Sequence, residues 1–237
     1  MIGKIGAINL QNNPTGSFEP SQGFTFFEDW LNNTYAGSTA WVADVNGTGA
    51  NALLTTTPQD QNHWGWVRLL TGTTNTGYAG IIQGLDAIRL GASTVTFEAV
   101  IQMPDLATEA EDFNLHVGLA DLSSQSVQGD GFYFEYDRST STKWLRCTAN
   151  NGTVTRTATT VDVAADTNVK LRATVTGGTV VDYWIDGAHV GQVTTNIPTG
   201  AGRVCGPIAA IVKTAGTTSR ELWMDYFYLN AKFNTAR

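Results

Sequence analysis

Charged side chains are scarce in this sequence, and the basic ones form no cluster along it. Only 15% of the 237 residues are charged, and 14 basic against 21 acidic residues give a net charge of −7. A protein that binds nucleic acid or an anionic membrane surface needs a concentrated positive patch. We therefore expect neither nucleic acid nor membrane as a partner.

Long apolar segments and a secretion signal are also missing. No run approaches the ~18 apolar residues that a transmembrane helix requires. The start, MIGKIGAINLQNN, has one lysine but lacks the apolar core of a signal peptide. These two absences predict a soluble protein that is made in a cytoplasm.

The chain is poor in the side chains that build metal sites and disulfide frameworks. Cys147 and Cys205 lie in strand-like contexts, which favours buried free thiols, with a disulfide as the alternative. His63, His116 and His189 are far apart and lack the spacing of a zinc site. No metal and no cofactor are predicted.

One segment resembles the start of a calcium-binding loop. Asp44 and Asn46-Gly47 have the expected spacing, but Thr55 stands where a glutamate should close an EF-hand loop. A turn at Asn46-Gly47 is the simpler interpretation, and calcium binding is the alternative.

The sequence is rich in alternating apolar and polar residues separated by turn residues. Residues 180–185 alternate until Asp186-Gly187 interrupts them, a pattern typical of a β-hairpin with a type I′ turn. Similar segments recur about every ten residues, which predicts an all-β sandwich or barrel. Only Leu106–Asp112 could form a helical turn, with an acidic loop as the alternative. The expected strands are residues 24–31, 41–45, 63–70, 79–83, 94–103, 113–119, 131–137, 143–149, 154–161, 169–175, 180–185, 189–194, 209–213 and 222–229.

The closing segment, 222–229, is apolar on both faces, as expected for a strand covered on both sides. Strict alternation divides its side chains into two sets. One set contains Leu222, Met224, Tyr226 and Tyr228, and the other contains Trp223, Asp225 and Phe227. Both sets are interpreted as core.

The first 23 residues differ from the rest of the chain. Glycine, asparagine and proline dominate them, and their isolated apolar side chains are Ile2, Ile5, Ile8 and Leu10. Such a segment cannot bury enough surface by itself to offset its ordering entropy. We expect residues 1–23 to form an extended arm that orders against a partner, or a frayed terminus, and residues 24–237 to form the sandwich.

The strand series resembles a concanavalin A-like (laminin-G-like) jelly roll. The residues that carry the resemblance are Phe97-Glu98-Ala99, Phe113–Asp121, Gly129–Phe134, Val169–Arg172, Tyr183–Gly187 and Leu222–Tyr226. The resemblance implies two antiparallel sheets stacked face to face. The combination is also similar to jelly-roll domains of tailed-bacteriophage fibres, head spikes and capsid decoration proteins.

Laminarinase-type hydrolases share this fold and use a Glu-x-Asp-x-x-Glu arrangement of carboxylates on one strand. The segment Glu135–Asp137 has the first spacing but lacks a third carboxylate, and the segment Glu221–Asp225 has apolar neighbours. Glu98 and Glu135 could face each other from two strands. Solvent-facing acids are the simpler interpretation, and no enzymatic activity is predicted.

Aromatic side chains give the best indication of ligand binding. Trp64 and Trp66 would project from one strand face beside His63 and Asp60. Indole faces next to amide and carboxylate groups are typical of sugar recognition. The alternative is that both indoles fill the space between sheets or an inter-subunit seam.

These observations predict a non-enzymatic virion structural protein, assembled in the host cytoplasm. It would decorate or cement the capsid of a tailed phage. Its expected partners are the major capsid protein or other virion proteins, and a trimer or dimer is expected from closed symmetry. The alternative is a carbohydrate- or receptor-binding module of a head spike or tail fibre that binds a cell-surface glycan. A glycan hydrolase or lyase is a third hypothesis.

Overall fold

A computed structural model describes residues 22–30, 41–55, 62–63, 65–83, 88–121 and 128–235. Within these residues, fifteen strands and no helix are present, and the strands form two antiparallel sheets. Among them there is accordingly no helix that is long and apolar enough to cross a membrane. The predicted jelly-roll sandwich is confirmed.

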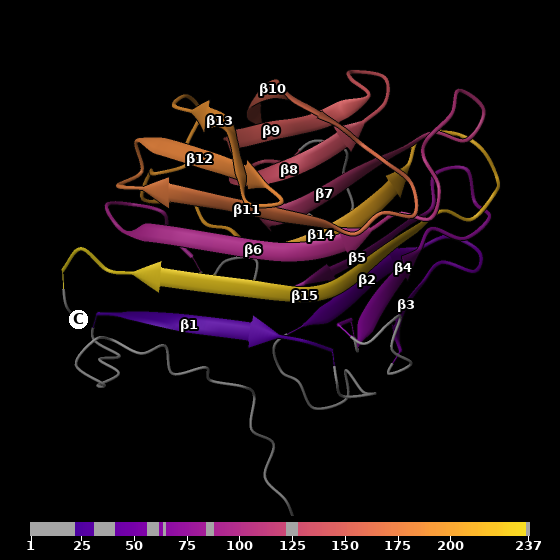
Figure 1. Cartoon of the computed structure of the whole chain (residues 1–237), viewed down its shortest axis with the longest axis horizontal. Helices are drawn as coiled ribbons and strands as arrows, with labels where there is room; N and C mark the ends of the chain where they lie inside the picture. The colour runs from indigo at the N-terminus through magenta and orange to yellow at the C-terminus, as the bar shows by residue number, and fades with distance from the viewer. Residues whose placement is uncertain are drawn as a thin grey trace, which may run out of the picture.

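Sheet A contains the strands that alternate most regularly between apolar and polar residues. Figure 1 shows β12, β11, β6, β15 and β1 lying side by side in this order. The full order is β13 (Ala188–Val193), β12 (Val180–Ile185), β11 (Val169–Thr176), β6 (Thr94–Gln102), β15 (Glu221–Lys232), β4 (Trp66–Leu70) and β3 (Asn51–Thr55), with β1 (Gly23–Glu28) paired to the other half of β15.

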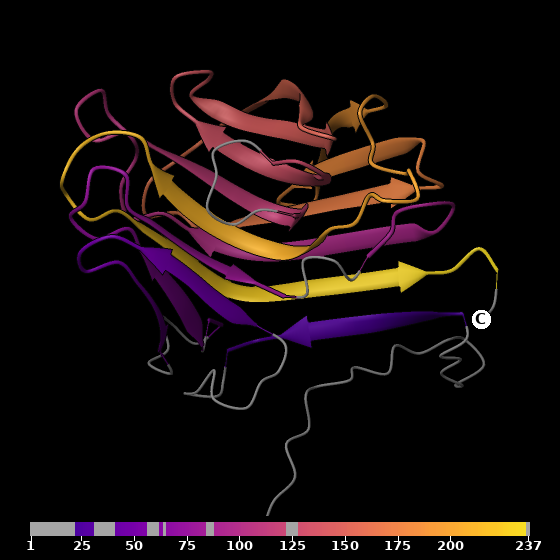
Figure 2. The same cartoon turned by 180° about the vertical axis from the view of Figure 1, so that it is seen from behind.

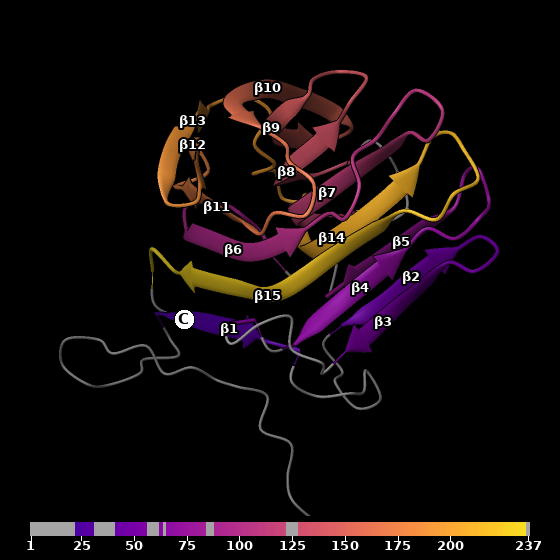
Figure 3. The ribbon, with the colours of Figure 1, turned by 45° about the vertical axis from the view of Figure 1, so that its right-hand side comes forward.

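Sheet B packs against sheet A, and its strands follow one another from β10 to β2 in Figure 3. The order is β10 (Thr153–Asp162), β9 (Lys143–Asn150), β8 (Gly131–Asp137), β7 (Phe113–Ala120), β14 (Gly206–Lys213), β5 (Tyr78–Ile82) and β2 (Val42–Asn46).

Aromatic side chains fill the space between the sheets. Phe97 of β6 is fully buried, and its ring lies 5.5 Å from that of Phe132 and 6.0 Å from that of Phe227. On β11, β12 and the first half of β6 every second side chain points into this core, and the side chains between them reach the surface of sheet A. Period-two alternation therefore builds both the core and an accessible outer face.

The Asp186-Gly187 hairpin forms as predicted. Both residues have positive φ angles, 50° and 84°, and Ile185 pairs with Ala188 across the turn. Positive φ at both central positions is the requirement of a type I′ turn.

The observed strands also differ in places from those that the alternation of apolar and polar residues predicts. The prediction missed β3, and the residues 106–112, offered as a helical turn, are irregular. The closing strand contains a β-bulge between Met224 and Tyr226, so its side chains change face there. Leu222, Met224 and Phe227 point into the core, whereas Tyr226 and Tyr228 point outward, which corrects the predicted sets.

The predicted arm falls almost wholly outside the described residues, and so do its side chains Ile2, Ile5, Ile8 and Leu10. Gly23 opens β1, which pairs with the end of β15. Figure 2 shows these two strands side by side from behind.

Candidate functional site

The outer face of sheet A, called the open face below, is crossed by a continuous row of large side chains. Each member of the row is the direct cross-strand neighbour of the next, from β1 to β13. With neighbouring strands ~4.8 Å apart, the row spans about 24 Å. Its members are Phe27, Tyr228, Glu98, Arg172, Trp184 and His189.

A second row runs beside the first and is polar throughout. Its members are Thr25, Asn230, Thr96, Thr174, Asp182 and Gln192. The hydroxyls of Thr96 and Thr174 lie 2.9 Å apart, and the Asn230 amide donates to the Thr25 hydroxyl at 2.8 Å. Side-chain pairs of this kind hold the rotamers of neighbouring strands in place.

Members of both rows line a groove of about 650 Å³ in the middle of the open face. The lining residues are Phe27, Thr94, Thr96, Glu98, Arg172, Thr174, Tyr226, Tyr228, Asn230 and Lys232. At one end the rings of Phe27 and Tyr226 are 5.6 Å apart. The Tyr226 hydroxyl donates to Glu98 at 2.6 Å, and burial together with this carboxylate raises the pKa of Tyr226.

Positive charge exceeds negative charge within the groove. Its charged residues are Arg172, Lys232 and Glu98, so two cations face one carboxylate in a chain whose net charge is −7. The Arg172 guanidinium lies over the Trp184 ring, 5.0 Å from its centroid. Stacking on an aromatic ring holds a guanidinium in place and leaves its N–H groups able to bind a ligand.

The groove residues Tyr226 and Tyr228 were missed in the sequence because they were assigned to the core. The bulge at Asp225 reverses the side on which they lie. A carboxylate inside an otherwise apolar strand is a signal that strict alternation could break at that point.

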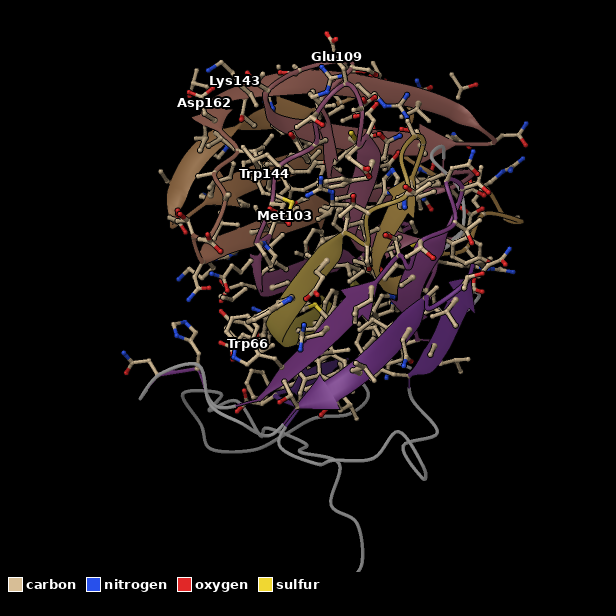
Figure 4. All side chains as sticks on the ribbon, turned by 90° about the vertical axis from the view of Figure 1, so that its right-hand side faces the viewer. Trp66, Met103, Glu109, Lys143, Trp144 and Asp162 are labelled. Atoms are coloured by element: carbon tan, nitrogen blue, oxygen red, sulfur yellow. The ribbon has the colours of Figure 1, made fainter. Side chains whose placement is uncertain are left out.

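Trp66, one of the residues predicted to bind sugar, lies elsewhere on the open face. Trp66 is only 1% exposed, and its ring packs against those of His63, at 5.8 Å, and Trp223, at 6.0 Å. Figure 4 shows Trp66 beside β4, far from the labelled Lys143. Neither face of this indole is available for stacking, which favours the packing interpretation for Trp66. Trp64 and Asp60 lie outside the described residues.

The acids of the segment 221–225 do not form a catalytic pair in this geometry. Glu221 accepts hydrogen bonds from Arg68, at 2.7 Å, and from the Trp223 indole, at 2.6 Å. Asp225 is 4% exposed and lies 4.0 Å from the His63 ring nitrogen. Both carboxylates are held by neighbouring side chains on the strand face.

The middle of the outer face of sheet B, called the closed face below, is buried. Along β7 and β14 every side chain is inaccessible, on both sides of the sheet. Its outward side chains form a second apolar cluster, separate from the core between the sheets: Ala120, Tyr133, Leu145, Cys147, Ala149 and Ile208.

A charged cluster lies within the closed face. Glu135 has no exposed surface and accepts two hydrogen bonds from Arg156, at 2.6 and 3.3 Å. The His116 ring lies 3.4 Å from the same carboxylate, and the Cys147 thiol donates to it at 3.2 Å. Burial opposes the charge of Glu135, but hydrogen bonds and charges from His116 and Arg156 prevail and lower its pKa to about 2.

This geometry corrects the idea that Glu98 and Glu135 could act together. Phe97 and Phe134, their neighbours in sequence, meet in the core with rings 6.4 Å apart, so the two glutamates point away from each other on opposite outer faces. Asp137 is bound instead to the turn that follows it, through Ser139 at 2.6 Å and Thr140 at 2.7 Å.

The cysteines and the suggested calcium loop can also be placed. Cys147 and Cys205 are both buried, and burial raises the pKa of each thiol. Asp44, the first residue of the suggested loop, accepts a hydrogen bond from the Tyr78 hydroxyl at 3.1 Å. Within the ranges that the structure describes, no group of three or more His, Cys, Asp or Glu side chains could hold a metal ion.

Two stacked antiparallel sheets, one with a groove across its outer face, define a concanavalin A-like jelly roll. The chain belongs to the SO2946-like family, because the family model for the C-terminal domain of SO2946-like proteins matches residues 62–225. A search of curated proteins returned no significant match.

Solved structures of the same fold include a protein of unknown function and carbohydrate-active enzymes. SO2946 from Shewanella oneidensis MR-1 is 16% identical with a TM-score of 0.64, covering 91% of this chain and 89% of that one. An endo-1,3-β-glucanase from Streptomyces sioyaensis is 13% identical with a TM-score of 0.60, covering 91% and 99%. An endo-β-1,4-glucuronan lyase from Trichoderma reesei is 12% identical with a TM-score of 0.58, covering 86% and 94%. At such identities the likeness shows the fold alone.

Proposed function

We propose that this protein binds a glycan in the groove of the open face. The observation that carries the proposal is the composition of the groove, in which the rings of Phe27, Tyr226 and Tyr228 adjoin hydroxyl, amide and charged groups. Sugar rings have apolar faces and polar edges, so they bind where aromatic surface and oriented hydrogen-bonding groups occur together. The names of two structural neighbours, a glucanase and a glucuronan lyase, are consistent with this class of ligand.

We further propose that the glycan is bound without being cleaved. Glycosidases of the common type need two carboxyl groups about 5 to 9 Å apart across the scissile bond. Glu98 is the only carboxylate among the residues that line the groove, and it already accepts a hydrogen bond from Tyr226. Glu135 lies on the opposite outer face, so it cannot be the second carboxylate.

The test is a glycan array with the wild type, followed by titration of the glycans that bind. Tyr228→Ala removes an aromatic face from the groove, and losing about 0.5–1.5 kcal/mol of stacking lowers affinity roughly two- to twelvefold. Tyr78→Ala is the matched control, because it removes the same ring from β5 in sheet B. A wild type that binds no glycan, or equal affinity in Tyr228→Ala and Tyr78→Ala, would refute the proposal.

A second candidate function is favoured by the edge of the sandwich formed by β2 and β3. Val42, Val45 and Leu53 are exposed there, at 58%, 39% and 40%. Each strand is the last in its sheet among the described residues, and strand edges with exposed apolar side chains are sites of protein association. We propose that this edge supports the role of a virion structural protein, joining copies of this chain or docking it on a phage capsid protein.

The oligomeric state tests this second candidate directly. The substitution pair Val42→Lys and Leu53→Lys should turn a dimer or trimer into a monomer in light scattering after size exclusion, and reduce co-sedimentation with capsids. Thr157→Lys, at an exposed position of β10, is the control. A wild type that stays monomeric and does not sediment with capsids would exclude this role.

A further inference from the structure

We propose that the ligand of the open face is an anionic linear glycan, whose carboxylate or sulfate groups are bound by Arg172 and Lys232. This inference rests on the proposed function and specifies the class of glycan. Its starting point is the charge of the groove, where two cations oppose one carboxylate although the chain carries a net charge of −7.

The two cations are available to a ligand. Both side chains are exposed, and within the described part of the chain neither forms a salt bridge. Stacking on Trp184 holds the Arg172 guanidinium at a fixed place. A stacked guanidinium matches the planar geometry of a carboxylate or sulfate group better than it matches a neutral hydroxyl.

The acidic side chains in and beside the groove mostly have partners within the protein. Glu98 accepts from the Tyr226 hydroxyl, and Asp182 is paired with His189 at 2.9 Å. The charges of Asp29 and Asp225 raise the pKa of Tyr226, but neither residue lines the groove. The charged groups that line the groove therefore sum to a positive charge.

The spacing of the cations indicates an oligomer. Arg172 lies two strands away from β15, and Lys232 lies four residues along β15 from Tyr228, the residue in the row of Arg172. Strand spacing and rise per residue then put their Cα atoms about 17 Å apart. Acidic groups on separate units of an oligomer match this separation, and both cations line the same groove.

The direction of the bound chain follows from the rows. A linear glycan that runs diagonally over the strands from Arg172 to Lys232 would cross the hydroxyl and amide row, which lies between the two cations. Hydrogen bonds from Thr96, Thr174 and Asn230 would then orient the sugar edges, while the cations select the acidic groups.

The experiment compares oligomers that differ only in charge. Hexagalacturonate and its methyl ester present the same sugar with and without negative charge, and a mannuronate hexamer and neutral cello-oligosaccharides widen the panel. The expected result is tighter binding of the acidic probes, with affinity that falls as salt is raised, because salt screens exposed charges. A galacturonate dimer should bind more weakly than the hexamer, since it cannot reach both cations.

Variants assign the effect to the two side chains. Arg172→Gln and Lys232→Gln should each lower affinity for acidic hexamers roughly two- to fivefold, and the double variant about tenfold. Arg172→Lys keeps the charge but loses the planar stacked group, so it should lower the affinity less than Arg172→Gln does. Lys143→Gln removes one positive charge from sheet B, where Lys143 pairs with Asp162 (Figure 4), and should bind like the wild type.

The possible failures are distinguishable. If neutral glycans bind as tightly as acidic ones, or if Arg172→Gln and Lys232→Gln leave affinity for the acidic probes unchanged, the inference of an anionic ligand is wrong while glycan binding stands. If no glycan binds the wild type, both proposals fall. Thermal unfolding of each variant separates a loss of binding from a loss of fold.

Discussion

The two outer faces of this sandwich differ in character although the sheets are similar in size. On sheet A the outward positions of β11, β12 and the first half of β6 reach solvent, whereas on sheet B the strands β7 and β14 are buried throughout. Both faces carry charged side chains. On the closed face the charges pair with each other, and on the open face two cations are left for a ligand.

This difference shows that burial decides whether a polar residue contributes to stability or to ligand recognition. A carboxylate such as Glu135, without contact to water, must be hydrogen-bonded within the protein, so it serves stability. A cation such as Arg172 at an accessible position costs little when it has no acidic partner, so it can serve recognition. Substitutions on the closed face should therefore change unfolding, and substitutions on the open face should change binding.

The largest effect is expected where the closed face loses a charge partner. Arg156→Met removes both hydrogen bonds from guanidinium to Glu135, and a buried carboxylate deprived of such a partner costs about 3–5 kcal/mol of unfolding free energy. Urea denaturation measures the change. Lys143→Met, which breaks the exposed pair with Asp162, is the control and should cost at most about 1 kcal/mol. Equal small losses in both variants would contradict the assignment of the cluster to stability.

The second effect is a pH dependence that belongs to the closed face. The pKa of Glu135 is about 2 in the folded protein against an ordinary value of 4.5. Between these values the unfolded chain binds the proton and the folded one does not, so stability should fall as the pH drops from about 4.5 to 2. The loss is on the order of 3 kcal/mol.

Denaturation of the wild type and Glu135→Gln at several pH values isolates this contribution. The variant lacks the titrating group, so the difference in unfolding free energy between the two proteins should shrink as the pH falls through this window. A difference that stays constant between pH 5 and pH 3 would show that Glu135 is not the group responsible.

The smallest effect is expected on the open face. Tyr226→Phe keeps the ring but removes the hydroxyl that donates to Glu98, so unfolding free energy should fall by only about 1 kcal/mol. Combining it with Glu98→Gln in a double-mutant cycle measures the coupling of the pair. A loss as large as that of Arg156→Met would erase the distinction between the two faces.

The fold could be predicted because alternation and turn chemistry are local properties. Asp186-Gly187 specifies its turn by the φ angles it tolerates, and the strand at each side follows from its own residues. The site depends instead on a β-bulge and on tertiary packing, which are not local properties of the sequence. One bulge at Asp225 moved Tyr226 and Tyr228 from the predicted core to the groove, and the packing of His63 and Trp223 hid Trp66.

The charged cluster was not predictable for a similar reason. Glu135, His116 and Arg156 are spread over three strands, and nothing in their spacing indicates that they meet. Their contact follows from cross-strand neighbours in sheet B, where His116 pairs with Glu135 and β9 brings β10 alongside. The order of strands, which a single sequence does not reveal, decides which lone polar residues become partners.

The position of β15 has a consequence for how the protein is made. This strand lies between β6 on one side and β1 and β4 on the other, so it joins the two halves of sheet A. Because it contains residues 221–232, a ribosome releases the central strand of the sheet only after all the others have emerged. Until then β1 lacks the strand with which it pairs among the described residues, and the groove on the open face lacks four of its ten lining residues.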